Sequence, residues 1–138
     1  MQIEQSLGFK FAKASQRLYT LFEGYLAAAG VTSKQHGTML ILSGQENLTQ
    51  KEVAAIQRID QTTMGQITDQ LEAKKLLRRI RHPRDRRAYC LELTDEGRQL
   101  TATLWADMKR CEAEFLKVLD HTEINQLFTL LDKLEKEN

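Results

Sequence analysis

The sequence predicts a mainly α-helical protein with a small β-hairpin wing, arranged as a winged helix-turn-helix with further helices at both ends. Three features indicate this fold class. The 138 residues include a single proline, Pro83, so few helices are interrupted. Apolar residues recur every three or four positions over long stretches at both ends of the chain. Between these stretches, two short segments with helix-capping residues precede the one segment that alternates like a strand.

The first helix is expected to end near Gly30, and a second helix follows it. The spacing of Thr32 and Gln35 predicts a capping box, in which each side chain accepts a hydrogen bond from the other residue's backbone N–H. Ser43 and Gly44 are expected to end this second helix. The first helix carries a stripe of apolar residues at alternating spacings of four and three: Leu7, Phe11, Ala14, Leu18, Leu21 and Tyr25.

Two short helices joined by a tight turn predict a helix-turn-helix. Thr49 and Glu52 have the spacing of a second capping box. Asp60 offers a new N-cap only four residues after Ile56, so one helix ends there and another, the predicted recognition helix, covers about residues 61–74. The buried face of the recognition helix is expected to carry Met64, Ile67 and Leu71.

Segments 76–80 and 88–93 are predicted to pair as a β-hairpin, which we call the wing (about residues 77–93). Pro83 and Asp85 supply turn residues between the two strands. Because side chains alternate along a strand, one face of the second strand is expected to carry Tyr89, Leu91 and Leu93, and the opposite face Cys90 and Glu92.

Two helices are expected after the wing. Thr94 is predicted to cap a long helix that reaches about Leu119, and a last helix carries Ile124, Leu127, Phe128, Leu131 and Leu134. The apolar stripes at the two ends of the chain can pack together, and a second copy of the chain would bury more of them. We therefore expect one domain over 1–138, with a winged helix-turn-helix at 32–93 and dimerisation helices at 1–30 and 94–138.

Charge is concentrated in one segment although the formal net charge is only +1. Residues 74–87 hold eight basic residues and one acidic residue, which gives +7, so the rest of the chain sums to −6. Residues 88–138 alone hold six basic and eleven acidic residues. A nucleic acid would therefore attract the wing and repel the segment that follows it.

The recognition helix begins with short, uncharged polar residues, which suit contacts with base edges. Glutamine can bond adenine through two hydrogen bonds, and threonine offers a hydroxyl group and a methyl group that can contact thymine. In the wing, Arg84, Arg86 and Arg87 suit a narrow minor groove, and Asp85 is expected to orient one of them through both carboxylate oxygens. The expected DNA-binding residues are Lys51, Arg58, Gln61, Thr62, Thr63, Gln66, Arg79, Arg84, Asp85, Arg86 and Arg87.

Residues 48–98 resemble the MarR family of winged-helix transcriptional regulators without a gap. The motifs that carry the resemblance are Leu48-Thr49-x-x-Glu52-Val53-Ala54, Leu71-Glu72-x-x-x-Leu76-Leu77-x-Arg79, Pro83-Arg84-Asp85-Arg86-Arg87 and Leu93-Thr94-x-x-Gly97. The resemblance implies an obligate homodimer whose end helices form the dimerisation domain, with two winged helices on a pseudo-palindromic operator in double-stranded DNA. It also implies a repressor that is released by a small phenolic or lipophilic ligand or by oxidation.

The chain departs from the family pattern at three positions. Arg58 stands where the family often has glycine, so this turn is expected either to avoid a positive φ or to be strained by it. Lys75 replaces another usual glycine, at the end of the recognition helix. Gln66 stands where arginine or lysine is common, which puts the family's base contact at that position in doubt.

An effector pocket is expected between the first helix and the long helix. Aromatic residues of these helices can form its walls, although such a stripe is also typical of a core. His36 lies where relatives line their ligand pocket, and the alternative for it is a buried, hydrogen-bonded histidine. The expected pocket residues are Tyr19, Phe22, Tyr25, His36 and Trp105.

Cys90 and Cys111 lack the spacing of a disulfide scaffold or a CxxC motif, so we expect buried, inert thiols in a reducing compartment. A redox-responsive regulator that uses either cysteine is the alternative. His36, His82 and His121 have no metal-ligand spacing, so neither a metal nor a cofactor is expected.

Two other classes of function stay open at this stage. One is a winged-helix module for protein interaction or DNA architecture that lacks operator specificity. The other is a small hydrolase or thiol enzyme, but the chain has no G-x-S-x-G, P-loop or G-x-G-x-x-G motif, so we expect no enzyme. The N-terminus does not resemble a signal peptide, and the longest apolar runs fall far short of the roughly 20 residues that span a bilayer, so we expect a cytoplasmic protein.

Overall fold

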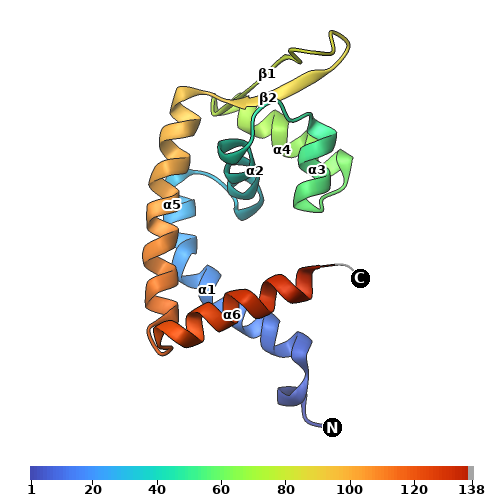
Figure 1. Ribbon diagram of the computed structural model, residues 1–138. Coiled ribbons are helices and arrows are strands. Elements are labelled where there is room, and N and C mark those ends of the chain that lie inside the picture. Colours follow the sequence, from blue (N-terminus) through green and yellow to red (C-terminus); the bar gives the residue numbers. More distant parts are fainter. Residues whose placement is uncertain (137–138) are drawn as a thin grey trace. The chain divides into compact units, whose positions relative to one another are not determined.

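The structure, a computed structural model, describes residues 1–136, so the last two residues of the predicted range 94–138 lie outside it. Helices and one antiparallel hairpin follow in the predicted order, which confirms the fold class (Figure 1). The chain divides into two compact units, one of residues 1–22 with 108–138 and one of residues 23–107. The elements are a 3-10 turn Ile3–Gln5, α1 Leu7–Ala29, α2 Ser33–Gly44, α3 Gln50–Gln57, α4 Gln61–Ala73, β1 Leu77–Arg81, β2 Tyr89–Leu93, α5 Asp95–Leu116 and α6 His121–Glu135.

The predicted helix caps are confirmed. The Thr32 hydroxyl accepts the N–H of Gln35 at 3.1 Å, and the Gln35 side chain accepts the N–H of Thr32 at the same distance. Thr49 and Glu52 form the same reciprocal pair, and the hydrogen bonds from Thr49 lower the pKa of the Glu52 carboxyl. The Asp60 carboxylate accepts the N–H of Thr63 at 2.8 Å and caps α4. Local sequence therefore sets where α2, α3 and α4 begin.

Two residues that stand where the family often has glycine adopt left-handed backbone conformations. Arg58 has φ 57° and Lys75 has φ 62°, so the turn at Arg58 does not avoid a positive φ. This conformation costs roughly 1–2 kcal/mol for a residue with a Cβ. The N–H of Ile59 donates to the carbonyl of Ala54 at 3.0 Å, and the N–H of Leu76 donates to the carbonyl of Leu71 at 3.0 Å. These hydrogen bonds close the C-terminal ends of α3 and α4 and hold both strained residues in place.

In the wing, Leu77 lies opposite Leu93 and Arg81 lies opposite Tyr89. Tyr89 is exposed although Leu91 and Leu93 of the same predicted face are buried, and Cys90 of the opposite face is fully buried, as predicted for this thiol. The reason for the burial of Cys90 is that other parts of the chain cover the side of β2 that faces away from β1. The N–H of Leu91 donates to the carbonyl of Leu48 at 2.9 Å, Thr49 and Cys90 form a β-bridge, and β2 also packs against α2 and α3.

The start of α5 docks on the segment between α4 and the wing. The Thr94 hydroxyl donates to the carbonyl of Lys75 at 2.7 Å, and the Thr94 N–H donates to the carbonyl of Leu76 at 3.1 Å. Gly97 is buried there, and a Cβ at this position would lie 2.1 Å from the Leu76 carbonyl oxygen. This close approach gives the Leu-Thr-x-x-Gly motif a physical reason: threonine caps α5, and glycine lets the helix meet the backbone of residue 76.

The unit of residues 1–22 and 108–138 exposes many large apolar side chains. Cys111 packs within it, and its Sγ lies 3.3 Å from the carbonyl oxygen of Leu21. Among the described residues, α6 has none that is buried. The exposed apolar side chains of this unit include Leu7, Phe11, Tyr19 and Leu21 of α1 and Phe128, Leu130, Leu131 and Leu134 of α6. No helix within residues 1–136 is long and apolar enough to cross a membrane.

Candidate nucleic-acid interface

The first turns of α4 present the predicted polar residues to solvent. Gln61, Thr62 and Gln66 are exposed, whereas Met64 and Ile67 are buried against the rest of the helix-turn-helix. The helix therefore has one face in the core and one face open to a partner. Thr63 was also expected to contact DNA, but its hydroxyl is bonded to Asp60.

Thr63 is occupied by the cap of α4. Its hydroxyl donates to Asp60 Oδ2 at 2.7 Å, and its backbone N–H donates to Asp60 Oδ1. These two hydrogen bonds, the backbone one first, lower the pKa of the Asp60 carboxyl, so the cap is charged at neutral pH and is lost only in acid. The exposed face for base contacts is thus Gln61, Thr62 and Gln66, and the exposed cations Lys51 and Arg58 lie on and just after α3.

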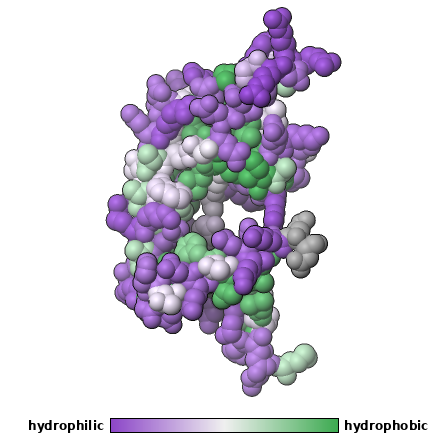
Figure 2. Space-filling model, viewed as in Figure 1, coloured by the Kyte–Doolittle hydropathy of each residue, from purple (hydrophilic) through white to green (hydrophobic). Residues whose placement is uncertain are grey.

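The tip of the wing is an ordered turn that exposes three arginines. The N–H of His82 donates to the carbonyl of Ala88, and the N–H of Ala88 donates to the carbonyl of Asp85, both at 3.0 Å. Arg84, Arg86 and Arg87 are exposed around this turn, with 95% of the Arg87 side chain open to solvent. In Figure 2 the projecting wing is coloured hydrophilic.

Asp85 is the partner of one wing arginine, Arg87, as predicted, but it does not hold the guanidinium through both oxygens. Its Oδ1 accepts the backbone N–H of Arg87 at 3.0 Å and lies 3.9 Å from Arg87 Nε. A short carboxylate two residues before an N–H in a turn forms an Asx turn more readily than a bidentate pair with a long side chain. Asp85 therefore shapes the turn.

Arg81 also holds the tip of the wing, and the sequence interpretation missed it. Its Nη1 donates to the carbonyl of Arg86 at 2.6 Å, and its guanidinium lies 5.6 Å from the centre of the Tyr89 ring. The register places Arg81 directly opposite Tyr89, so a correct strand alignment could have revealed the pair. Arg81 bonds the backbone carbonyl of Arg86 and not its side chain. It therefore stabilises the turn at the tip and leaves the exposed guanidinium groups of the wing available for a partner.

Several cations of the basic segment are engaged in ion pairs inside the second unit. Arg79 lies 2.9 Å from Asp69 and 2.6 Å from Glu72, with 30% of its side chain exposed. Arg78 lies 2.6 Å from Glu92. Arg79 thus ties β1 to α4, which is a different role from the DNA contact predicted for it. The charge open to a polyanion is concentrated at the tip of the wing.

Comparison with known proteins agrees with this architecture. The model of the MarR family matches residues 29–88, which hold α2, the helix-turn-helix and most of the wing. A Thauera aromatica protein, named as a transcriptional regulatory protein for the hcr operon, is 28% identical over 133 residues, which cover 96% of this chain and 80% of that protein. Residues 29–88 of the chain are therefore similar to the MarR family.

Further proteins that are similar to this chain are regulators. The transcriptional repressor NicR of Pseudomonas putida is 30% identical over 98 residues, which cover 71% of this chain and 62% of NicR. The repressor CouR bound to a 23-mer DNA duplex has a TM-score of 0.88 at 26% identity, with 99% of each chain covered. PcaV of Streptomyces coelicolor, solved with its natural ligand, has a TM-score of 0.81 at 25% identity and covers 97% of this chain and 94% of PcaV. The chain is accordingly a transcriptional regulator.

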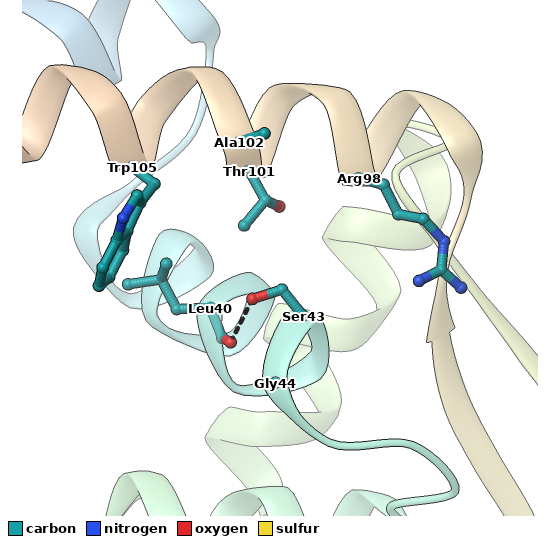
Figure 3. A pocket seen from close by; sticks show the side chains of 7 residues that line it. All are labelled: Leu40, Ser43, Gly44, Arg98, Thr101, Ala102 and Trp105. Carbon is teal, nitrogen blue, oxygen red and sulfur yellow. Dashed lines mark hydrogen bonds between the residues drawn. The ribbon is translucent and has the colours of Figure 1, made fainter.

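The chain has a pocket of about 660 Å³ between α2 and the first half of α5 (Figure 3). Trp105 stands over Leu40 at one end, and Arg98 lies at the other end beside β2. The Ser43 hydroxyl on the α2 side donates to the carbonyl of Leu40 at 2.7 Å. The lining residues are Leu40, Ser43, Gly44, Arg98, Thr101, Ala102 and Trp105.

Of the predicted effector residues, Trp105 alone lines this pocket. Phe22 and His36 are buried, and burial lowers the pKa of the His36 imidazole, which favours its neutral form. Tyr19 and Tyr25 are exposed. Spacing along the first helix could not distinguish a pocket wall from a core or surface position, because that depends on which helix packs against it.

Both cysteines are buried, as predicted. Burial raises the pKa of the Cys90 thiol, so the reactive thiolate is disfavoured at neutral pH. The two residues therefore have little support as redox sensors. Within residues 1–136 no group of histidine, cysteine or acidic side chains is placed to hold a metal ion.

Proposed function

We propose that the chain is a homodimeric repressor of transcription that binds a pseudo-palindromic operator in double-stranded DNA and is released by a small molecule. The observation that carries this proposal is the pairing of an uncharged polar helix face with an adjacent tip of exposed arginines. The first suits base edges, and the second suits phosphates and a narrow minor groove. A regulator that binds operator DNA acts where the DNA is, and we therefore propose a cytoplasmic protein.

We assign sequence recognition to Gln61, Thr62 and Gln66 of α4. We assign phosphate contacts to Lys51 and Arg58, which are both exposed on and just after α3. Thr63 and Arg79 act indirectly, because their polar groups are engaged with Asp60 and with Asp69 and Glu72. The wing supplies affinity for any duplex.

The dimer is supported by the exposed apolar side chains of α1 and α6. Phe128 is 51% exposed and Leu134 is 66% exposed, although both lie on the apolar stripe of α6. Many large apolar side chains left exposed in one unit are more typical of an interface than of a free surface. Two copies of the chain would bury it and would place two recognition helices on one duplex.

Replacing Gln61 or Thr62 with alanine is expected to relax operator specificity. Loss of one good base contact costs about 1–3 kcal/mol, so the ratio of operator affinity to scrambled-duplex affinity falls roughly tenfold. Gln126→Ala, at an exposed glutamine of α6, is the matched control and keeps the wild-type ratio. Fluorescence anisotropy with both duplexes measures the ratio. An unchanged ratio in both α4 variants would place base readout elsewhere.

The pocket beside Trp105 is proposed as the effector site, for a small aromatic or lipophilic ligand. Its volume of about 660 Å³ fits such ligands, and an indole and a leucine form an apolar end. A panel of phenols and aromatic acids, followed by Trp105 fluorescence, should contain compounds that both change the emission and release operator DNA. Ala102→Trp would fill the pocket and is expected to abolish both responses while operator binding persists. Release of DNA from this variant at wild-type ligand concentrations would contradict the assignment.

A further inference from the structure

Hydrogen bonds join the junction between α1 and α2 to the C-terminal end of the recognition helix. We call the three side chains that make them, Gln35, Gln70 and Lys74, the α2 clasp. Lys74 Nζ donates to the carbonyl of Gly30 at 2.5 Å and to Gln35 Oε1 at 2.8 Å. Gln35 Nε2 donates to Gln70 Oε1 at 2.8 Å. The clasp lies entirely within the unit of residues 23–107.

Gln35 lies at the centre of the clasp, because its side-chain amide bonds both Gln70 and Lys74. The residue is 3% exposed, and its Oε1 also accepts the N–H of Thr32 in the capping box of α2. A buried amide that loses a partner retains a desolvation cost, so these bonds favour one geometry strongly. The capping box of α2 and the end of α4 are thus connected through one side chain.

A second contact joins α2 to the other helix of the helix-turn-helix. Gln57, the last residue of α3, donates through Nε2 to the carbonyl of Lys34 at 2.9 Å and accepts from the Thr38 hydroxyl at 2.7 Å. A Cβ on Gly37 would lie 2.8 Å from Gln57 Nε2, so the absence of a side chain lets Gln57 lie across α2. The first two turns of α2 therefore hold the C-terminal ends of both α3 and α4.

We propose that Gln35 and Lys74 are positioning residues for operator recognition, which fix the direction of α4 without contacting DNA. This inference rests on the proposed function. The clasp holds Lys74, while Gln61 and Thr62 lie at the opposite end of a helix of 13 residues, about 20 Å away. A change of direction by about 5° at the clasp moves that end by nearly 2 Å, which is enough to break hydrogen bonds with base edges.

The alternative is that Lys74 binds a phosphate as one more cation of the basic segment. Lys75 provides the comparison, because it carries the same charge one residue away and its side chain is exposed. A phosphate role predicts similar losses of affinity for all duplexes on replacing either lysine. A positioning role predicts that the two replacements differ in specificity.

The test compares Lys74→Met with Lys75→Met on an operator selected by the wild-type protein and on a scrambled duplex, over a range of salt concentrations. Lys74→Met is expected to lower the ratio of operator to scrambled affinity about tenfold, the effect of one lost base contact, with the salt slope unchanged. Lys75→Met is expected to keep the wild-type ratio. Gln70→Ala removes only one bond of the clasp and gives a smaller drop, which keeps the test open if Lys74→Met does not fold by circular dichroism.

Two results would overturn the positioning role, and a third would overturn the proposed function. A wild-type ratio in both folded Lys74→Met and Gln70→Ala overturns the positioning role. Equal losses for the two lysine variants, with a shallower salt slope, also overturn it in favour of phosphate binding. If the wild-type protein itself does not prefer any selected sequence over the scrambled duplex, the proposed function fails instead.

Discussion

Replacing both Arg86 and Arg87 with alanine weakens binding to every duplex, specific or not, and flattens its dependence on salt. Each arginine that leaves a phosphate lowers the slope of log affinity against log salt by about 0.9, so the double variant loses nearly 2. The affinity itself falls by about a factor of ten for each charge-assisted hydrogen bond lost. Both side chains are exposed at the ordered tip of the wing, so their loss should leave the fold intact.

The control for the wing variant is Arg78→Ala, which removes one arginine charge from β1, half of the charge that the double variant removes. The guanidinium of Arg78 is paired with Glu92 at 2.6 Å, and this hydrogen bond raises the pKa of Arg78. Replacing Arg78 should change the slope of log affinity against log salt by much less than the value of about 0.9 expected for one lost phosphate contact. Titrations at several salt concentrations distinguish the two. Equal slopes for wild type and the Arg86 and Arg87 double variant would show that the exposed arginines do not bind DNA.

Gly97→Ala is expected to destabilise the chain by about 3 kcal/mol, the upper range for overpacking a buried site. Helix propensity alone would favour alanine by about 1 kcal/mol. The Cβ, however, would lie 2.1 Å from the carbonyl oxygen of Leu76, a backbone atom that itself accepts the N–H of Thr94. Either α5 or the segment before the wing must then move. Urea unfolding followed by circular dichroism measures the loss.

Gly24→Ala provides the matched comparison within α1. Among the described residues, no atom lies within 4 Å of a Cβ at this position, so the substitution should add roughly 0.5–1 kcal/mol of stability through helix propensity. Opposite signs for the two glycines are the expected pattern. A stabilised Gly97→Ala would mean that α5 does not dock on residue 76 as described.

Predictions that depend on a few neighbouring residues agree with the structure. The capping boxes at Thr32 and Thr49 and the N-cap at Asp60 were predicted from spacing, because the hydrogen bonds they form close within three residues. Hydrophobic periodicity located the long helices for the same reason. A β-hairpin was predictable from its turn residues and strand alternation.

Predictions that depend on distant partners failed or were incomplete. Cys90 was predicted to be buried, but the parts of the chain that bury it, residues 48 and 49 and two helices, could not be identified from β2 alone. Arg79 was predicted to contact DNA, and Lys74 was counted only as part of the basic segment, yet their side chains have partners 10 and 44 residues away in the chain. The pocket beside Trp105 likewise depends on how α2 and α5 pack. Near-neutral net charge therefore hides both a cationic tip and a set of internal ion pairs.

The most direct test of the central claim is selection of bound DNA from a random pool, followed by the stoichiometry of the complex with the selected duplex. Two winged helices on one dimer predict a pseudo-palindrome whose half-sites are about one helical turn, roughly 10 base pairs, apart, with two chains bound per duplex. Analytical ultracentrifugation determines the number of chains. A pool that shows no sequence preference, or one chain per duplex, would contradict a dimeric operator-binding regulator.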